Sequence, residues 1–394
     1  MDKCRPTILA CFLSYIVQSV IVNFAPLLFV TFSEEFDVSL ELLTLLATLN
    51  FGVQLTVDLL ASRFIHKIGY RKGMLLAHTM AFLGLVSMMV LPDLLGGFAG
   101  LLISVMIYAV GGGLLEVLVS PIVEACPTKN KAGIMSLMHS FYCWGVVATV
   151  LVSTGFFVLF GTHNWRIMAI IWAILPLCNF LMFLKVPLYP IVSEGEDKPN
   201  YKELFSQKIF VLMLVLMVCS GACEQAVAQW ASAFTEKALS LDKTTGDLLG
   251  VCGFSVMMGI ARMGYAKFSE KLPMKPAMIF SAALCIVSYL VVSLSSSPVV
   301  GLIGCIVCGF SVGLFWPGTF SLGTVSVKGC STTMFALMAL GGDIGCSLGP
   351  SVVGAVSGMF GGEFKIGILA AIVFPVVLLI GLILLTRIKE KKTL

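Results

Sequence analysis

Four carboxylic acids lie inside stretches of the sequence that are otherwise apolar. They are Asp58, Glu116, Glu224 and Asp343. If these stretches cross a lipid bilayer, each charge costs about 2.5–3.5 kcal/mol at the membrane centre, so such acids persist where they face a cavity, a partner or a proton. The chemistry open to them is proton uptake and release, ion pairing, or hydrogen bonding to a polar solute.

Glu116 is the strongest candidate for a proton-coupling group. Gly112 and Ser120 lie one turn away on either side of it, so the helix face beside the carboxyl is open. The alternative is a neutral Glu that is hydrogen-bonded within its own bundle. His139 is a second proton-coupling candidate, because imidazole titrates near neutral pH. For His139 the alternative is a structural residue that caps a neighbouring helix.

Glu224 begins a polar helix face that would suit a sugar. Gln225 and Gln229 are spaced i and i+4 along this face, and Trp230 adds a flat apolar surface. Amides give directional hydrogen bonds and an indole can pack on a sugar ring. The alternative is that these groups join neighbouring helices. Two single residues in other helices are further candidate substrate ligands: Asn23 and Trp316.

Arg262 is predicted to lie inside a membrane span as well, at the position that corresponds to Asp58 in an internal repeat. Opposite charges at equivalent positions are typical of a gate or a packing contact, because an unpaired buried charge costs several kcal/mol. The sequence leaves the pairing open, with Asp343 as one candidate partner for Arg262. We expect Asp58 and Arg262 to lie away from Glu116 and Glu224.

The composition requires lipid as part of the solvent. Of 394 residues, 58% are hydrophobic and 12% are charged, whereas soluble domains carry about 25% charged residues. The sequence has no phosphate-binding loop, no basic stripe for nucleic acid and no metal-type Cys or His spacing, since its 13 cysteines are scattered. We therefore expect a protein that is not an enzyme, with no cofactor and no nucleic-acid partner, driven by a gradient such as that of protons.

The apolar runs predict an all-α membrane protein with twelve spans, because about 20 apolar residues cross a bilayer. The spans are 8–32, 40–62, 74–91, 100–125, 132–160, 165–186, 208–235, 246–266, 277–294, 298–325, 332–360 and 364–387. A polar segment, 187–207, is predicted to be a cytoplasmic linker between six-helix halves 1–186 and 208–394. Of the 25 Lys and Arg residues, 20 fall on one side, which places both termini in the cytoplasm of a cell membrane.

The two halves repeat each other. Matching pairs are Gly113 with Gly313 and Glu116 with Trp316 at an offset of 200, and Asp58 with Arg262 at 204. Parallel repeats of this kind are a transporter architecture.

The loop at 62–72 is similar to the most specific motif of the major facilitator superfamily, Gly-x-x-x-Asp-Arg/Lys-x-Gly-x-Arg/Lys-Arg/Lys. Its basic residues and Gly69 match, whereas Ser62 replaces the first Gly and His66 replaces the Asp. The resemblance implies a gating role for Arg71.

Within that superfamily, the stretches 111–116, 139–145 and 342–350 resemble fucose-permease-like sugar carriers. This resemblance implies that helices 1, 4, 7 and 10 line a central cavity. It also implies that Glu116 is a proton-linked carboxyl in that cavity.

Together these features predict a secondary transporter that moves a small polar, carbohydrate-like solute by alternating access, in symport with protons, as a monomer in membrane lipid. The alternative is proton-coupled efflux of amphipathic compounds, which the Met- and Phe-rich spans favour. A membrane sensor that transports nothing is a third hypothesis. It is disfavoured because the longest polar segment, 187–207, is too short for a soluble output domain.

Overall fold

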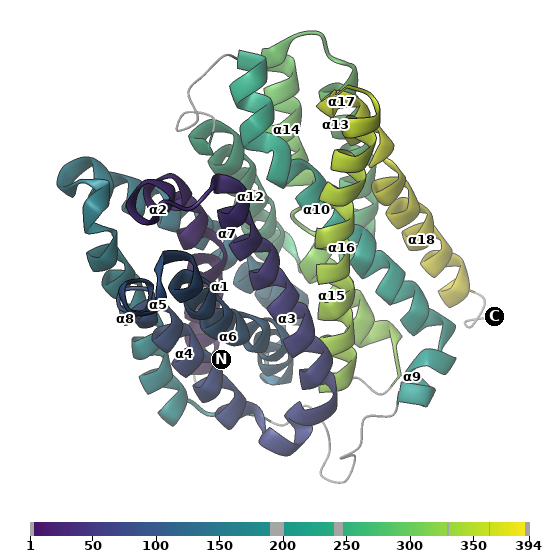
Figure 1. Ribbon diagram of the computed structural model, residues 1–394. Helices are drawn as coiled ribbons and strands as arrows, with labels where there is room; N and C mark the ends of the chain where they lie inside the picture. Colours follow the sequence, from purple (N-terminus) through teal and green to yellow (C-terminus); the bar gives the residue numbers. More distant parts are fainter. Residues whose placement is uncertain (1–3, 190–200, 240–246, 329–330, 362, 391–394) are drawn as a thin grey trace. The chain divides into compact units, whose positions relative to one another are not determined.

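The computed structural model describes residues 4–189, 201–239, 247–328, 331–361 and 363–390, and every regular element in these ranges is a helix (Figure 1). Within these ranges, ten helical stretches are long and apolar enough to cross a membrane. The remaining two predicted spans are also helical. One is α4 (Tyr70–Ser87), and the other is η2 (Asp247–Cys252) followed by α12 (Gly253–Phe268). The prediction of an all-α, multi-pass membrane protein is confirmed.

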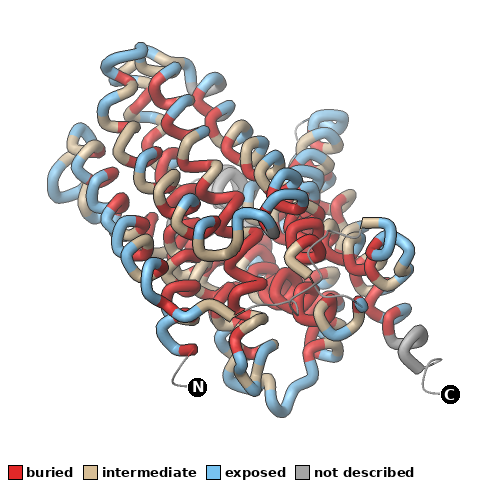
Figure 2. The backbone as a smooth tube through the Cα atoms, turned by 90° about the horizontal axis from the view of Figure 1, so that it is seen from below, coloured by how far each residue is buried: buried red, intermediate tan, exposed pale blue. Residues whose placement is uncertain are grey.

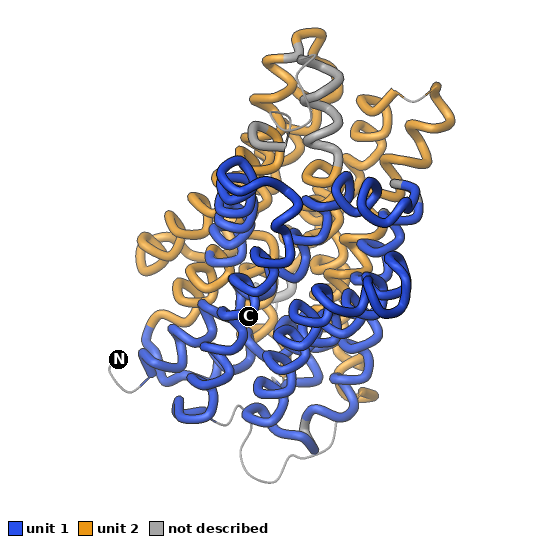
Figure 3. Tube along the Cα trace, turned by 60° about the vertical axis from the view of Figure 1, so that its left-hand side comes forward, with its two compact units in different colours: residues 1–129, 141–199, 331–336 blue, residues 130–140, 200–330, 337–394 orange. Residues whose placement is uncertain are grey.

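Contacts divide the chain into two compact units, which are described separately (Figure 3). Unit 1 consists of Met1–Lys129, Phe141–Pro199 and Ser331–Ala336. Unit 2 consists of Asn130–Ser140, Asn200–Cys330 and Leu337–Leu394. The predicted boundary at 187–207 stays a prediction, because part of that segment lies outside the described residues.

Unit 1 is built around the long helix α6. Its helices are α1 (Arg5–Leu27), α2 (Phe29–Phe36), α3 (Leu40–Ile68), α4, α5 (Leu91–Leu95), α6 (Gly97–Ala125), the second part of α7 (Lys131–Phe160), η1 (Thr162–Asn164) and α8 (Trp165–Lys185). Helix α6 packs against α1, α3, α4 and α5, and α8 packs against α4 and α1. The largest fully buried side chains in this unit are aromatic, which gives it a close-packed core.

Unit 2 is built around α10. Its helices are α9 (Tyr201–Ser206), α10 (Lys208–Leu239), η2, α12, α13 (Met274–Leu294), α14 (Pro298–Val312), α15 (Phe315–Ser326), most of α16 (Thr332–Met359), α17 (Phe364–Ala370) and α18 (Val373–Glu390). Helix α10 packs against α14, α15 and α18. Buried and exposed residues alternate along the long helices (Figure 2). The exposed faces carry large apolar side chains such as Phe280, as expected where lipid is the solvent.

Three of the predicted spans contain a break between two helices. Span 8–32 is divided into α1 and α2, span 298–325 into α14 and α15, and span 364–387 into α17 and α18. A proline lies close to each break: Pro26, Pro317 and Pro375. Proline has no N–H and clashes with the carbonyl four residues before it, which places the breaks before Pro317 and Pro375, whereas Pro26 lies within the last turn of α1.

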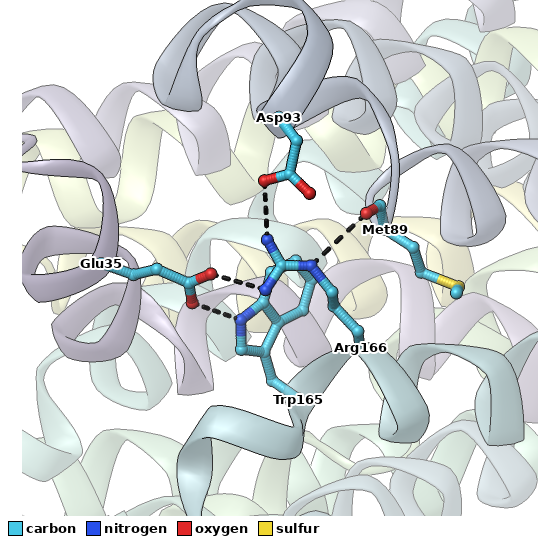
Figure 4. A network of polar contacts seen from close by, with 5 residues as sticks. All are labelled: Glu35, Met89, Asp93, Trp165 and Arg166. Atoms are coloured by element: carbon cyan, nitrogen blue, oxygen red, sulfur yellow. Dashed lines mark hydrogen bonds and ion pairs between the residues drawn. The ribbon is translucent and has the colours of Figure 1, made fainter.

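One end of unit 1 is held together by Arg166, the second residue of α8 (Figure 4). Its guanidinium bridges Glu35 on α2, at 2.5 Å, and Asp93 on α5, at 2.9 Å. The indole N–H of Trp165, which is fully buried, donates to the other oxygen of Glu35 at 2.6 Å. The guanidinium also lies over the indole ring, 4.5 Å from its centroid. This network ties α2, α5 and α8 together.

We expect Arg166→Ala to lower the free energy of unfolding of unit 1 by about 1–2 kcal/mol. The two ion pairs are partly exposed and contribute about 0.2–1 kcal/mol each, and the cation–π contact adds about 0.5–1 kcal/mol. The measurement is thermal unfolding in detergent. Arg166→Lys is the control, because Lys keeps the charge but cannot bridge two carboxylates with a planar fork. It should fall between wild type and the Ala variant, and equal losses would contradict the bridging role.

Candidate functional site

Helix α6 carries three consecutive glycines, and each lies against a different neighbour within unit 1. A Cβ on Gly111 would fall 2.6 Å from the carbonyl oxygen of Ala77 on α4, and a Cβ on Gly113 would fall 2.9 Å from Cβ of Val57 on α3. Side chains are excluded at such distances, so the glycines allow close helix packing. This packing fixes the position of Glu116 one turn further along α6.

Three amide side chains form a buried ladder beside Glu116. Gln18 Nε2 on α1 donates to Gln54 Oε1 on α3 at 2.8 Å. Gln54 Nε2 donates in turn to Asn50 Oδ1 at 2.9 Å, and Asn50 Nδ2 donates to the carbonyl of Ile21 at 3.3 Å. All three amide residues are buried. The ladder therefore links α1 and α3 through hydrogen bonds that lipid could not replace.

Glu116 lies at one end of this ladder. Gln18 Nε2 lies 3.5 Å from Glu116 Oε2, and the Glu116 residue is half-buried. A Cβ on Gly112 would fall 3.0 Å from Gln18 Oε1, so the glycine makes room for the amide. Sequence reasoning missed the ladder residues. The signal that could have found them is Asn50 and Gln54, which lie four residues apart in an apolar span.

Unit 2 contains a buried ion pair. Arg262 Nη2 on α12 lies 3.2 Å from Glu224 Oε2 on α10, and both residues are buried. Two backbone carbonyls accept the other donors of Arg262: Gly313 O from Nε at 2.8 Å and His139 O from Nη1 at 2.9 Å. The expectation that Arg262 lies away from Glu224 was wrong. The two are direct partners, because a buried guanidinium needs a counter-charge.

The helix break at Pro317 explains how Gly313 can serve this arginine. Pro317 has no N–H for the carbonyl of Gly313, four residues earlier, and α14 ends at Val312. The freed carbonyl oxygen accepts from Arg262 instead. The break between α14 and α15 therefore supplies one ligand of the buried guanidinium.

Aromatic side chains surround the same region of unit 2. The rings of His139 and Phe320 lie 6.0 Å apart, and those of Trp316 and Phe320 lie 6.5 Å apart. Trp316 is buried against α16, where a Cβ on Gly342 would fall 2.3 Å from its ring. His139 belongs to the first part of α7, in unit 2. The structure thus brings Glu224, His139 and Trp316 into one neighbourhood with Arg262.

We expect Gly342→Ala to destabilise unit 2 by about 1–3 kcal/mol, because the new methyl group must displace the indole of Trp316 and overpack the core. Gly358→Ala, on the same helix α16, is the matched control. A Cβ there meets nothing within 4 Å. That variant should be neutral or slightly stabilising, since Ala favours a helix more than Gly by about 1 kcal/mol. Thermal unfolding of the two purified variants is the measurement, and equal melting shifts would contradict the contact.

Other predicted site residues have separate surroundings. Asn23 donates to the carbonyl of Ser19 in its own helix at 2.8 Å. Gln225 is half-buried and Gln229 is exposed on α10, while the side chain of Trp230 lies outside the described residues. Their substrate-binding roles stay predictions.

The predicted gating residues differ in what they contact. Asp58 on α3 and Asp343 on α16 are buried in unit 1 and unit 2 respectively. The structure pairs Arg262 with Glu224. A pairing of Arg262 with Asp343 stays a prediction. Arg71 donates to the carbonyls of Phe183 and Val186 at 2.6 and 2.9 Å. These contacts cap the C-terminal end of α8.

The motif loop that carries Arg71 has a local structural reason for its glycine. Gly69 separates α3 from α4 and adopts φ of 81°, which residues with a side chain rarely adopt. The side chain of His66, which replaces the motif's Asp, lies outside the described residues.

In the part of the chain that the structure describes, no group of three or more His, Cys, Asp or Glu could hold a metal ion.

Comparison with known proteins identifies the family. The family model of the Major Facilitator Superfamily matches residues 7–350. The chain belongs to the major facilitator superfamily. It is therefore a multi-pass membrane transporter, and the family predicted from the sequence is confirmed. No curated protein matches the sequence.

Solved structures share this superfamily fold along nearly the whole chain. A variant of the E. coli fucose:proton symporter FucP is 17% identical, with a TM-score of 0.78, over 95% of this chain and 97% of that one. The proton:xylose symporter XylE, bound to 6-bromo-6-deoxy-D-glucose, is 13% identical, with a TM-score of 0.82, over 98% and 96%. The human organic anion transporter MFSD10 is 15% identical, with a TM-score of 0.74, over 97% and 99%. At these identities the likeness shows the fold alone.

Proposed function

We propose that this superfamily transporter moves a small polar, carbohydrate-like solute in symport with protons, by alternating access. The observation that carries the proposal is Glu116, a half-buried carboxyl on a membrane helix at the end of the amide ladder. A carboxyl in such a place can change its protonation, and the ladder supplies amide groups of the kind that sugars hydrogen-bond. The sugar:proton symporters among the similar structures support the same proposal.

Unit 2 supports the proposal through a second polar group among aromatic rings. The Glu224–Arg262 pair lies in the same neighbourhood as Trp316 and Phe320. A sugar ring can pack against an aromatic face while its hydroxyls bond to charged groups. Substrate roles for Glu224 and Trp316, and a proton relay through His139, belong to this proposal. We also propose that the protein is a monomer in the cell membrane with both termini in the cytoplasm. It would have no enzyme activity and no bound cofactor.

The test is sugar-driven proton movement by purified protein in liposomes. Fucose, xylose and glucose are added in turn outside vesicles that contain a pH-sensitive dye, with no pre-set gradient. Symport predicts that at least one sugar acidifies the vesicle interior and makes the outside more alkaline. Vesicles without protein should show no pH change. Uptake of radiolabelled sugar without any pH change would support transport of a sugar but overturn proton coupling.

Proton-coupled efflux of amphipathic compounds is the second candidate. The similarity to an organic anion transporter favours it. A proton gradient imposed on the same vesicles would then drive movement of an amphipathic dye, and no sugar would shift the melting temperature. Dye movement without any sugar response would replace the first proposal.

A further inference from the structure

An apolar groove lies on the surface of unit 2, between α12, α13 and α14. It has a volume of about 400 Å³, within the range of about 300–1,000 Å³ that small-molecule sites occupy. Its floor includes Ala261, Tyr265 and Ala277, which are buried, and its walls include Phe268 and Phe280, which are exposed. No residue of the amide ladder lines the groove, and neither do Glu116, Glu224 and Arg262.

The groove runs inward from the loop between α12 and α13. Its lining residues on α12 extend from Phe268 back to Ile260, which is about 12 Å of helix. The end near the loop is also lined by Leu272 and Pro276. The groove is thus elongated along α12 and lined almost entirely by apolar groups, as an acyl chain requires.

Three lysines stand at that end. Each directly precedes a lining residue in the sequence: Lys267 before Phe268, Lys271 before Leu272, and Lys275 before Pro276. Lys267 and Lys271 are exposed, and Lys275 is half-buried. Glu270 is the acidic residue in this segment, so the segment keeps a net positive charge. Positive charge beside an apolar groove complements an anionic headgroup joined to an acyl chain.

We propose that this groove, with the three lysines that precede its lining residues, is a binding site for one membrane phospholipid with an anionic headgroup. The acyl chain occupies the groove along α12, and the lysines hold the phosphate of the headgroup. The predicted topology puts this loop on the cytoplasmic side, where anionic lipids attract basic segments. Lipid binding in this groove does not depend on which solute the protein transports.

The test measures which lipid stays bound to the protein after purification in detergent. Native mass spectrometry follows one-to-one titration with palmitoyl-oleoyl phosphatidylglycerol or with phosphatidylcholine that has the same chains. We expect the anionic lipid to be retained about 25-fold more than the zwitterionic one, since the three lysines and Glu270 leave two net positive charges and each contributes a factor of about five. Equal retention of the two lipids overturns the proposal, and it would indicate a groove without headgroup preference.

Two sets of variants separate the headgroup from the chain. K267Q/K271Q/K275Q should lose the preference for phosphatidylglycerol, whereas K185Q/K202Q/K208Q, which removes as much charge from exposed lysines elsewhere, should keep it. Equal losses in both triple variants would mean a general charge effect and overturn the site.

Filling the groove tests the acyl-chain part. Gly264→Leu projects into the groove, where a Cβ meets nothing within 4 Å, and Gly155→Leu on α7 is equally unhindered outside it. Only Gly264→Leu should lower the retention of both lipids, by about fivefold or more. Phe280→Ala, which removes an exposed wall residue, is the second variant if Gly264→Leu does not fold. Full retention of phosphatidylglycerol by a folded groove variant would overturn the groove as the site.

Discussion

Replacing Arg262 by Ala is expected to lower the free energy of unfolding of unit 2 by about 3–5 kcal/mol, because it leaves a buried charge without its partner. Glu224 loses the guanidinium that lies 3.2 Å from its carboxylate. The carbonyls of Gly313 and His139 also lose a donor each, and an unsatisfied buried acceptor costs about 1–3 kcal/mol. The measurement is the midpoint of thermal or denaturant unfolding in detergent.

The double variant shows whether the loss comes from the pair. Glu224→Gln alone leaves Arg262 uncompensated and should also destabilise the protein. Glu224→Gln combined with Arg262→Ala removes both charges and should recover part of the loss, giving a coupling energy of about 1–3 kcal/mol. Lys67→Ala, at an exposed position beside the ring of Phe64, is the control and should change little. Additive losses in the double variant would contradict an energetic pair.

Arg262 also shows where sequence reasoning reaches its limit. Its presence inside a span and its repeat relation to Asp58 could be read from the sequence. Its partner could not, because Glu224 is 38 residues away and the contact depends on how α10 and α12 are rotated and packed. The hydrogen bond to the carbonyl of Gly313 depends in addition on a helix break near Pro317, inside the span predicted at 298–325.

The amide ladder was missed for a different reason. Gln18, Asn50 and Gln54 are neutral, and a neutral amide in an apolar span costs less than a charge, so it marks a functional site less clearly. Their significance appears only when α1, α3 and α6 are seen packed together through the glycines beside Glu116. The twelve spans, by contrast, depend on composition over about 20 residues each, so local sequence predicts most of them.

Glu116→Gln is expected to abolish proton-driven accumulation of the solute while leaving its exchange across the membrane intact. A proton that crosses about 100 mV supplies about 2.3 kcal/mol, which corresponds to an accumulation ratio of about fifty. Gln cannot take up a proton, so this ratio should fall towards one. Gln nevertheless resembles protonated Glu in shape and can still hydrogen-bond to Gln18, which lies 3.5 Å from the carboxylate. Counterflow of labelled against unlabelled sugar, with no gradient, should therefore stay within about threefold of wild type.

The ladder gives this prediction its structural reason. Deprotonated Glu116 only accepts hydrogen bonds, and it faces Nε2 of Gln18. A protonated carboxyl is also a donor, so we expect proton uptake by Glu116 to change its contact with Gln18. Gln18 is bonded in turn to Gln54 at 2.8 Å, which gives a route from Glu116 to the contact between α1 and α3. Glu34→Gln, at an exposed site on α2, is the control and should keep both activities. If Glu116→Gln still accumulates the solute, the coupling proton binds elsewhere; if counterflow is lost as well, Glu116 binds the solute itself or stabilises the fold.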